Sequence, residues 1–167
     1  MHTLVSTERL YVRHLERSDH AFILRLVNSP GWLQYIGDRN IHTAQAAEDY
    51  IQHQQDGYQT FRFGLSAVCL QENNDVIGLC GFLKREELPH QDIGFALLPD
   101  YKRKGYASEI VRASLAKYWE THSEEPVLAQ VQFDNQASIG LLKKLGFEQW
   151  DYPVSCNKTL LLKRYPD

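Results

Sequence analysis

The chain has 167 residues, of which 43% are hydrophobic and 23% charged, and its formal net charge is −3. This length and composition are typical of one globular domain with a buried core, so we predict a single domain over residues 1–167. Without a global positive charge, nucleic acid is not expected as a partner. No apolar run is long enough to cross a bilayer and the N-terminus lacks the pattern of a signal peptide, so no membrane partner and a cytoplasmic location are expected.

Hydrophobic periodicity and turn signals divide the chain into strands and helices. In chain order, the sequence predicts a strand at Leu10–Leu15, helices at Asp19–Val27 and Ala44–Gln54, strands at Phe63–Leu70, Val76–Leu83 and Asp92–Leu98, a helix at Gly105–Glu120, a strand at Val127–Phe133, a helix at Asn135–Leu145, and strands at Trp150–Tyr152 and Thr159–Lys163. Antiparallel hairpins followed by a strand–helix–strand unit predict an α/β (α+β) fold. We expect a mixed, mostly antiparallel central sheet of about six to seven strands with helices on both faces.

The ends of these helices carry recognisable signals. Ser18, Thr43 and Asn135 are predicted N-caps, because their side chains can accept a hydrogen bond from the first turn. The segment Asn28–Gly31 is predicted to end the first helix, and Gly146 the last one.

The cysteines and histidines give no sign of a metal site. Cys69, Cys80 and Cys156 are odd in number and widely spaced, which argues against both a disulfide framework and a zinc site. Buried free thiols are the expected state of the cysteines. The histidines show no spacing typical of metal ligands, so no metal is predicted.

The segment Pro99–Ser108 has the features of a phosphate-binding loop. It joins a strand to the start of a helix and contains three consecutive basic residues, Lys102, Arg103 and Lys104. The first N–H groups of a helix have no intrahelical partner and attract anions, and Gly105 allows a close approach to the backbone. A phosphorylated cofactor is therefore expected, although a plain turn glycine and a solvated charge run remain alternatives.

At this point the sequence resembles the GNAT superfamily of N-acetyltransferases. Lys102–Ala107 is similar to the family's Q/R-x-x-G-x-G/A loop, with Lys in place of the usual first residue. Asn135–Ser138 and Leu145–Phe147 resemble its second signature. The opening Thr7–Leu10 is most similar to the subgroup of ribosomal-protein N-terminal (alanine/serine) acetyltransferases. The resemblance extends from about Thr7 to Lys163.

The resemblance implies acetyl-CoA as cosubstrate, with direct transfer to the primary amine of a peptide N-terminus or a small molecule. It also implies a binding site for the cofactor along the end of a strand, the following loop and the last helix. The implied cofactor-binding residues are Ala96, Leu97, Leu98, Lys102, Arg103, Lys104, Gly105, Tyr106, Ala107, Ser108, Asn135 and Ser138.

Amine attack on a thioester requires a proton acceptor and a group that assists the departing thiolate. Asp92 is the first candidate for the base, with Glu86 and Glu87 as neighbours, and Ser138 is the candidate for the second role. A surface carboxylate and a local helix cap are the structural alternatives for Asp92 and Ser138. The family often has a tyrosine acid where this chain has Leu142.

Three functions remain open from the sequence. The first is an acetyl-CoA-dependent N-acetyltransferase, acting as a monomer or homodimer. The second is a non-catalytic CoA-binding regulatory module, which Leu142 would favour. The third, an unrelated nucleotide-binding protein, is disfavoured because neither G-x-x-x-x-G-K-[ST] nor G-x-G-x-x-G occurs.

Overall fold

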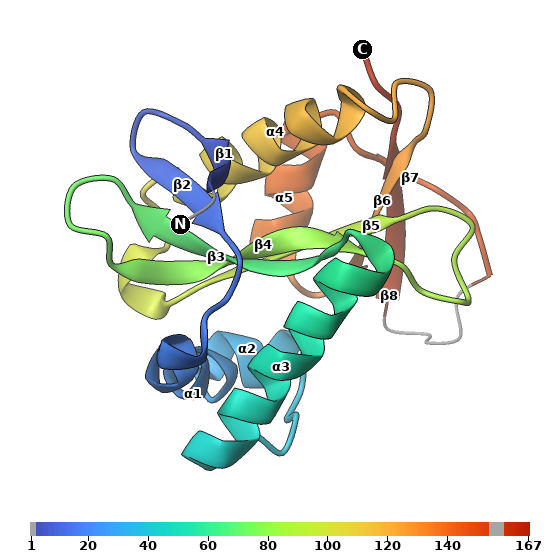
Figure 1. Ribbon diagram of the computed structural model, residues 1–167. Helices are drawn as coiled ribbons and strands as arrows, with labels where there is room; N and C mark the ends of the chain where they lie inside the picture. The colour runs from blue at the N-terminus through green and yellow to red at the C-terminus, as the bar shows by residue number, and fades with distance from the viewer. Residues whose placement is uncertain (1–2, 154–158) are drawn as a thin grey trace.

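The computed structural model describes residues 3–153 and 159–167. Within them, eight strands form one sheet in the order β1-β2-β3-β4-β5-β6-β8-β7 (Figure 1). The strands are β1 Thr3–Ser6, β2 Leu10–Arg13, β3 Gly64–Leu70, β4 Val76–Leu83, β5 Asp92–Leu97, β6 Val127–Gln132, β7 Glu148–Gln149 and β8 Thr159–Arg164. All neighbours are antiparallel except β5 and β6, which are parallel. The prediction of a mixed, mostly antiparallel sheet is confirmed, with more strands than the six or seven expected.

Helices cover both faces of the sheet, as predicted (Figure 1). Helices α1, α2 and α3 lie on one face of the sheet, and α4 and α5 lie on the other. The helices are α1 His20–Val27, α2 Pro30–Tyr35, α3 Ala44–Phe61, α4 Tyr106–Trp119 and α5 Gln136–Lys144.

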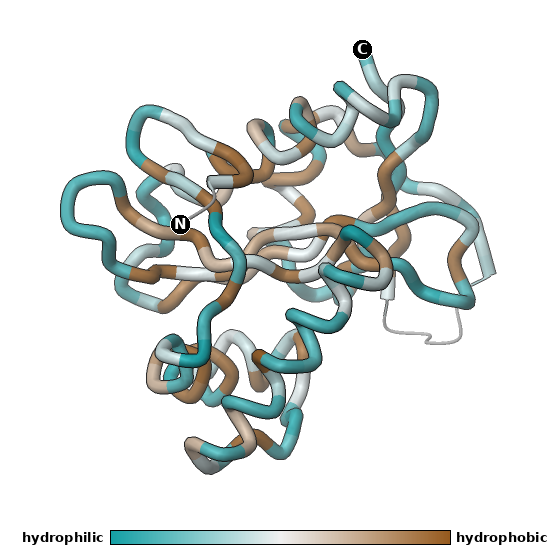
Figure 2. Tube along the Cα trace, viewed as in Figure 1, coloured by the Kyte–Doolittle hydropathy of each residue, from teal (hydrophilic) through white to brown (hydrophobic). Residues whose placement is uncertain are grey.

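Alternation of side chains along the strands produces two hydrophobic cores. In β2, Leu10 and Val12 pack toward α4 and α5, whereas Tyr11 packs toward α1–α3. The strands are accordingly the most continuously hydrophobic segments, and the polar residues gather on loops and on α3 (Figure 2). Successive strand side chains point to opposite faces, so one short strand supplies both cores.

The structure adds elements that the sequence pattern did not reveal. Strand β1 was not predicted, and its burial pattern is only partial because it lies at the sheet edge. The segment Asn28–Gly31 does end α1, but Pro30 also begins α2, where proline fits because its missing N–H is not needed.

Helix α3 is longer than predicted, reaching Phe61 instead of Gln54. Its last turns are held by side-chain contacts to β3: Leu65 N–H donates to Gln54 Oε1 at 3.0 Å, and the Tyr58 hydroxyl donates to Leu65 O. Tertiary contacts, which periodicity does not record, therefore extend the helix. Its predicted start is confirmed, because Thr43 Oγ1 accepts the Ala46 N–H at 3.1 Å.

Two predictions near other element ends are wrong. The strand expected at Trp150–Tyr152 lies earlier, at β7, and the rings of Trp150 and Tyr152 instead stack at 4.8 Å beside Leu128 and Leu161. Ser18 does not cap α1. It lies inside a 3₁₀ turn at Arg17–Asp19, and Asp19 is the residue that precedes the helix.

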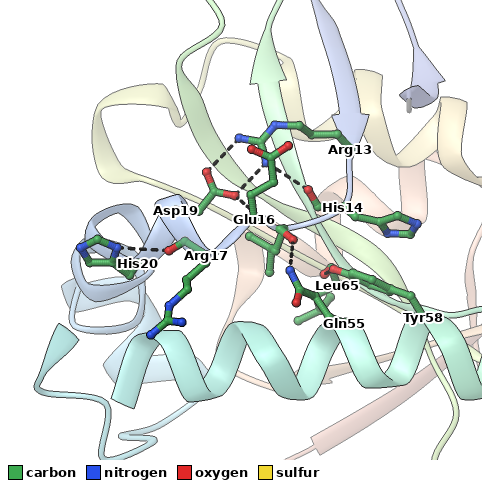
Figure 3. A network of polar contacts seen from close by, with 10 residues as sticks. Arg13, His14, Glu16, Arg17, Asp19, His20, Gln55, Tyr58 and Leu65 are labelled. Atoms are coloured by element: carbon green, nitrogen blue, oxygen red, sulfur yellow. Dashed lines mark hydrogen bonds and ion pairs between the residues drawn. The ribbon is translucent and has the colours of Figure 1, made fainter. Parts of the chain in front are cut away.

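Asp19 forms a buried ion pair with Arg13, which ties β2 to the start of α1 (Figure 3). Arg13 Nη1 and Nη2 donate to the two carboxylate oxygens at 2.7 and 2.8 Å, and Glu16 N–H donates to one of them at 2.8 Å. Asp19 relieves the cost of burying Arg13 and raises the Arg13 pKa above its ordinary value, although burial opposes that rise. Cys69 and Cys80 are free and buried, as predicted, and Cys156 lies outside the described residues.

We predict that Asp19→Ala lowers the free energy of unfolding by about 3–5 kcal/mol, because the substitution leaves a buried guanidinium without its partner. Urea unfolding measures this change. Arg17→Ala is the matched control, since the Arg17–Glu48 pair involves a largely exposed arginine and is expected to contribute less than about 1 kcal/mol. Equal losses in the two variants would contradict the proposed role of the buried pair.

Candidate active site

The site is built on a gap in the sheet between β5 and β6. These parallel neighbours are joined at a single pair, Asp92 with Leu128, where Leu128 N–H donates to Gln91 O at 2.9 Å. Beyond it, β5 stays paired with β4 as far as Leu97, and β6 stays paired with β8 as far as Gln132. The two strands therefore diverge toward their C-terminal ends.

Alternation decides which backbone groups of β5 face this gap. Leu98 N–H donates to Ile77 O at 2.8 Å, and the Ala96 carbonyl oxygen lies against Gly78 of β4. The backbone N–H and C=O groups of the even-numbered residues of β5 thus point to β4, and those of Phe95 and Leu97 point to the gap. Of the strand residues predicted to bind cofactor, Leu97 has backbone groups available there, whereas the Leu98 N–H is already used.

The gap opens toward the loop that begins α4. A 3₁₀ turn at Pro99–Tyr101 follows β5, and the next residues include two in left-handed conformation, Arg103 with φ 62° and Gly105 with φ 82°. Gly105 is the N-cap of α4 and no side chain caps it. The first N–H groups of this helix are therefore not satisfied by a side-chain cap.

Both lysine side chains of the loop lie against neighbouring residues. Lys102 Nζ lies so close to Gly31 of α2 that a Cβ there would stand 2.5 Å from it. Lys104 Nζ lies 5.5 Å from the centre of the Tyr101 ring. Backbone donors, rather than a lysine, are therefore best placed to contact an anion at Gly105.

Asp92 lies where β5 and β6 separate, and it is almost completely buried, with 2% exposure. Arg85 Nε donates to both its oxygens, at 3.0 and 3.1 Å. Burial raises the pKa of Asp92, and the Arg85 charge opposes but does not cancel that rise. A single N–H shared by two oxygens leaves lone pairs on each, so the carboxylate can still accept a proton.

The other two predicted catalytic residues come from different elements than Asp92. Glu86 is exposed in the loop between β4 and β5. Asn135 caps α5 as predicted, its Oδ1 accepting Ser138 N–H at 3.2 Å, and Ser138 is half-buried. Leu142, at the position of the family's tyrosine acid, is buried in the core.

Arg85 was not identified as a site residue from the sequence. Its spacing from Asp92 is short, but nothing in the pattern of the loop indicates that the guanidinium turns back onto the strand. In residues 3–153 and 159–167, no group of three or more His, Cys, Asp or Glu side chains is arranged to hold a metal ion. None of the described helices is both long and apolar enough to span a membrane.

The parallel pair β5–β6 thus splits beside the uncapped start of α4. The model of the family described as "Acetyltransferase (GNAT) domain" matches residues 9–148. The chain belongs to this family and is an acyltransferase, which confirms the resemblance found from its motifs.

Individual relatives agree with this assignment. The N-acetyltransferase YoaA of Bacillus subtilis, itself uncharacterised, is 26% identical over 150 residues, covering 89% of this chain and 85% of YoaA. An acetyltransferase from Agrobacterium tumefaciens has a TM-score of 0.84 at 22% identity, covering 99% of this chain and 95% of that chain. The ribosomal L7/L12 α-N-protein acetyltransferase RimL, solved with coenzyme A, has a TM-score of 0.83 at 17% identity over 99% of each chain. These structural likenesses establish the fold, and RimL is a member of the subgroup that the opening residues resemble.

The raised pKa of Asp92 predicts a specific pH dependence of stability. A folded-state pKa above the unfolded value means that ionised Asp92 is disfavoured by folding, so its stabilising contribution is complete at low pH and is lost as pH rises through the folded pKa. Asp92→Asn removes this dependence. Urea unfolding from pH 3 to pH 8 should show the variant gaining stability relative to the wild type as pH rises. A difference that is independent of pH would contradict the burial of an ionisable Asp92.

Proposed function

We propose that this protein is an acetyl-CoA-dependent N-acetyltransferase that transfers an acetyl group to a primary amine by direct attack on the thioester. One observation carries the proposal: the β5–β6 gap opens directly onto the left-handed loop and the uncapped start of α4. The gap suits the amide-bearing pantetheine arm, and the loop suits the pyrophosphate.

In the proposed reaction, the amine nitrogen attacks the thioester carbonyl carbon. A C–N bond forms and the C–S bond breaks, so the acetyl group passes to the amine and the thiol of CoA leaves with a proton. Backbone N–H groups of β5 that face the gap, such as that of Phe95 or Leu97, are suited to stabilise the negative oxygen that develops. The oxyanion requires no side chain in this scheme.

The amine must lose a proton to react, and Asp92 is our first candidate to receive it, directly or through one water. Its burial raises its pKa, which makes the carboxylate a better base than an exposed one. Its position at the closed end of the gap, where β5 and β6 still pair, supports this assignment. Ser138, half-buried on α5, remains the proposed partner of the thiolate.

A peptide N-terminus is the acceptor we propose to test first. RimL, which shares this fold, is described as acting on the N-terminus of a ribosomal protein. Small amines are the second class to test. Calorimetric titration with acetyl-CoA, with ATP and NAD as controls, precedes a screen of peptides and polyamines for release of CoA thiol. Lack of acetyl-CoA binding would overturn the proposal.

The same screen tests the alternative that the sequence left open, a non-catalytic CoA-binding module, which was raised because Leu142 takes the place of the tyrosine acid. Under that alternative, acetyl-CoA binds selectively but no acceptor in the screen releases thiol. Turnover that is lost with substitution of Asp92 or Ser138 would exclude it.

We predict that Gly105→Glu weakens acetyl-CoA binding at least about a hundredfold. The substitution puts a carboxylate where the pyrophosphate is expected, and it forces a side chain onto a residue with φ 82° whose Cβ would meet Arg9 Nη2 at 3.3 Å. Calorimetry measures the affinity and thermal melting checks the fold. Gly140→Glu is the control, because a Cβ at Gly140 meets nothing within 4 Å. A folded Gly105→Glu protein with wild-type affinity would refute the loop assignment.

Asp92→Asn is expected to lower kcat about a hundredfold or more at pH 6.5, which is the range of general-base catalysis, and less at pH 9, where more acceptor is already neutral. Its affinity for acetyl-CoA should stay within about twofold, since Asp92 lies away from the loop. Glu124→Gln, at an exposed position, is the carboxylate control. If Glu86→Gln shows this pH-dependent loss and Asp92→Asn does not, Glu86 is the base.

A further inference from the structure

Arg9, in the turn between β1 and β2, reaches across to the loop before α4. Its Nη1 donates to the carbonyl oxygen of Lys104 at 3.0 Å, and its guanidinium carbon lies 4.5 Å from the centre of the Tyr106 ring. Its Nε and Nη2 contact Glu109 Oε2 at 2.7 and 2.6 Å. The other oxygen of Glu109 accepts from Thr7 Oγ1 at 2.6 Å. The segment Thr7–Arg9 and the first turn of α4 are thereby fastened to each other around the loop.

The contact with Lys104 fixes the direction of a backbone N–H. In a trans peptide unit the C=O and the following N–H point to opposite sides of the chain. Because the Lys104 carbonyl points at Arg9, the Gly105 N–H points away from it. That N–H has no acceptor in the described part of the chain, and Gly105 itself is exposed. It is therefore presented outward beside the free N–H groups of the first turn of α4.

We propose that Arg9 is a positioning residue for acetyl-CoA: by holding the Lys104 carbonyl, it aims the Gly105 N–H at the pyrophosphate without touching the cofactor. This inference rests on the proposed function. Three of the five guanidinium N–H donors contact Glu109 or Lys104, which holds Arg9 against the Lys104–Gly105 peptide. A direct bond from a remaining donor to phosphate is the alternative that the test has to exclude.

Glu109 serves to hold Arg9 in this position. Burial alone raises the pKa of Glu109, but hydrogen bonds from Thr7 and Arg9 outweigh it and keep the pKa below its ordinary value. The carboxylate is therefore ionised at neutral pH and remains a strong acceptor. The negative charge of Glu109 by itself opposes binding of a phosphate nearby. In this proposal, the benefit of holding Arg9 in position outweighs that repulsion.

The contacts of Arg9 with Glu109 and Lys104, called the clamp below, contribute little to overall stability. The side chain of Arg9 is 44% exposed and that of Glu109 is 21% exposed, and pairs of this kind add little to the free energy of folding. Its effect is expected in the loop. If loss of Arg9 lets the Lys104–Gly105 peptide rotate, so that only about a tenth of the molecules present the N–H correctly, the apparent Kd rises about tenfold.

The test uses the full-length protein with Arg9→Met, Arg9→Lys and Glu109→Ala, and Arg17→Met as the control from another exposed Arg–Glu pair. Calorimetry gives the Kd for acetyl-CoA and for S-acetylpantetheine, which lacks the phosphates. The amide ¹H–¹⁵N cross-peak of Gly105 reports the peptide orientation in the free protein.

We expect Arg9→Met and Arg9→Lys to raise the Kd for acetyl-CoA about tenfold while the Kd for S-acetylpantetheine stays within about twofold. Lysine keeps the charge but has no planar fork to reach Lys104 and Glu109 together. Glu109→Ala should also weaken acetyl-CoA binding, although it removes a repulsive charge. The Gly105 cross-peak should move or broaden in these variants and not in Arg17→Met.

Opposite results would overturn the inference. Tighter acetyl-CoA binding by Glu109→Ala, or wild-type affinity in Arg9→Lys, would show that Arg9 acts by its charge alone. Equal weakening for both ligands would show a general structural role. Should Arg9→Met not fold, the Lys and Ala variants give the same decision. Failure of the proposed function itself has a separate signature, namely a wild-type protein that does not bind acetyl-CoA.

Discussion

The single bridge between β5 and β6 is the constraint on which the rest of the site depends. Each strand is fully paired on its other side, β5 with β4 and β6 with β8, so the two can separate without leaving either strand unsupported. The separation exposes backbone groups along one edge of β5. A buried strand edge without partners is costly unless water or a ligand satisfies it, which explains why such a gap has a use in binding. Helix α4, which connects the two strands, begins after the loop that follows the C-terminal end of β5.

The two ends of β5 have opposite electrostatic character, with N–H donors at one end and a carboxylate at the other. At its C-terminal end, the start of α4 and the left-handed loop offer N–H donors to an anion. At its N-terminal end, Asp92 offers a buried carboxylate to a proton, and Arg85 keeps that carboxylate from being buried without a partner. The length of the strand separates the two charges. A ligand with phosphates at one end and a reactive carbonyl at the other is the kind of molecule that satisfies both.

Local features of this site could be predicted from the sequence, and long-range ones could not. Gly105, the Asn135 cap and the strand Asp92–Leu97 each follow from neighbouring residues, because caps, turns and alternation are set within a few positions. The clamp from Arg9 to Glu109 joins residues 100 apart, and no local pattern encodes it. Helix α2 was not predicted because Pro30 was interpreted as part of the segment that ends α1, whereas it begins the next helix. The split in the sheet is the most consequential feature, and it is a property of strand pairing that neither strand shows alone.

The absence of a tyrosine at position 142 bears on how the thiolate leaves. Leu142 is 1% exposed and packs with Ile139 and Leu145 in the core, so α5 uses this position to bind the sheet instead of serving the reaction. The thiol of CoA is a far better leaving group than an amine or alkoxide, since its pKa lies within about two units of neutrality. Departure of the thiolate therefore gains less from a general acid than attack gains from a base. On this reasoning, the deprotonation of the amine is the step that most needs a side chain, and the buried carboxylate of Asp92 is the group suited to it.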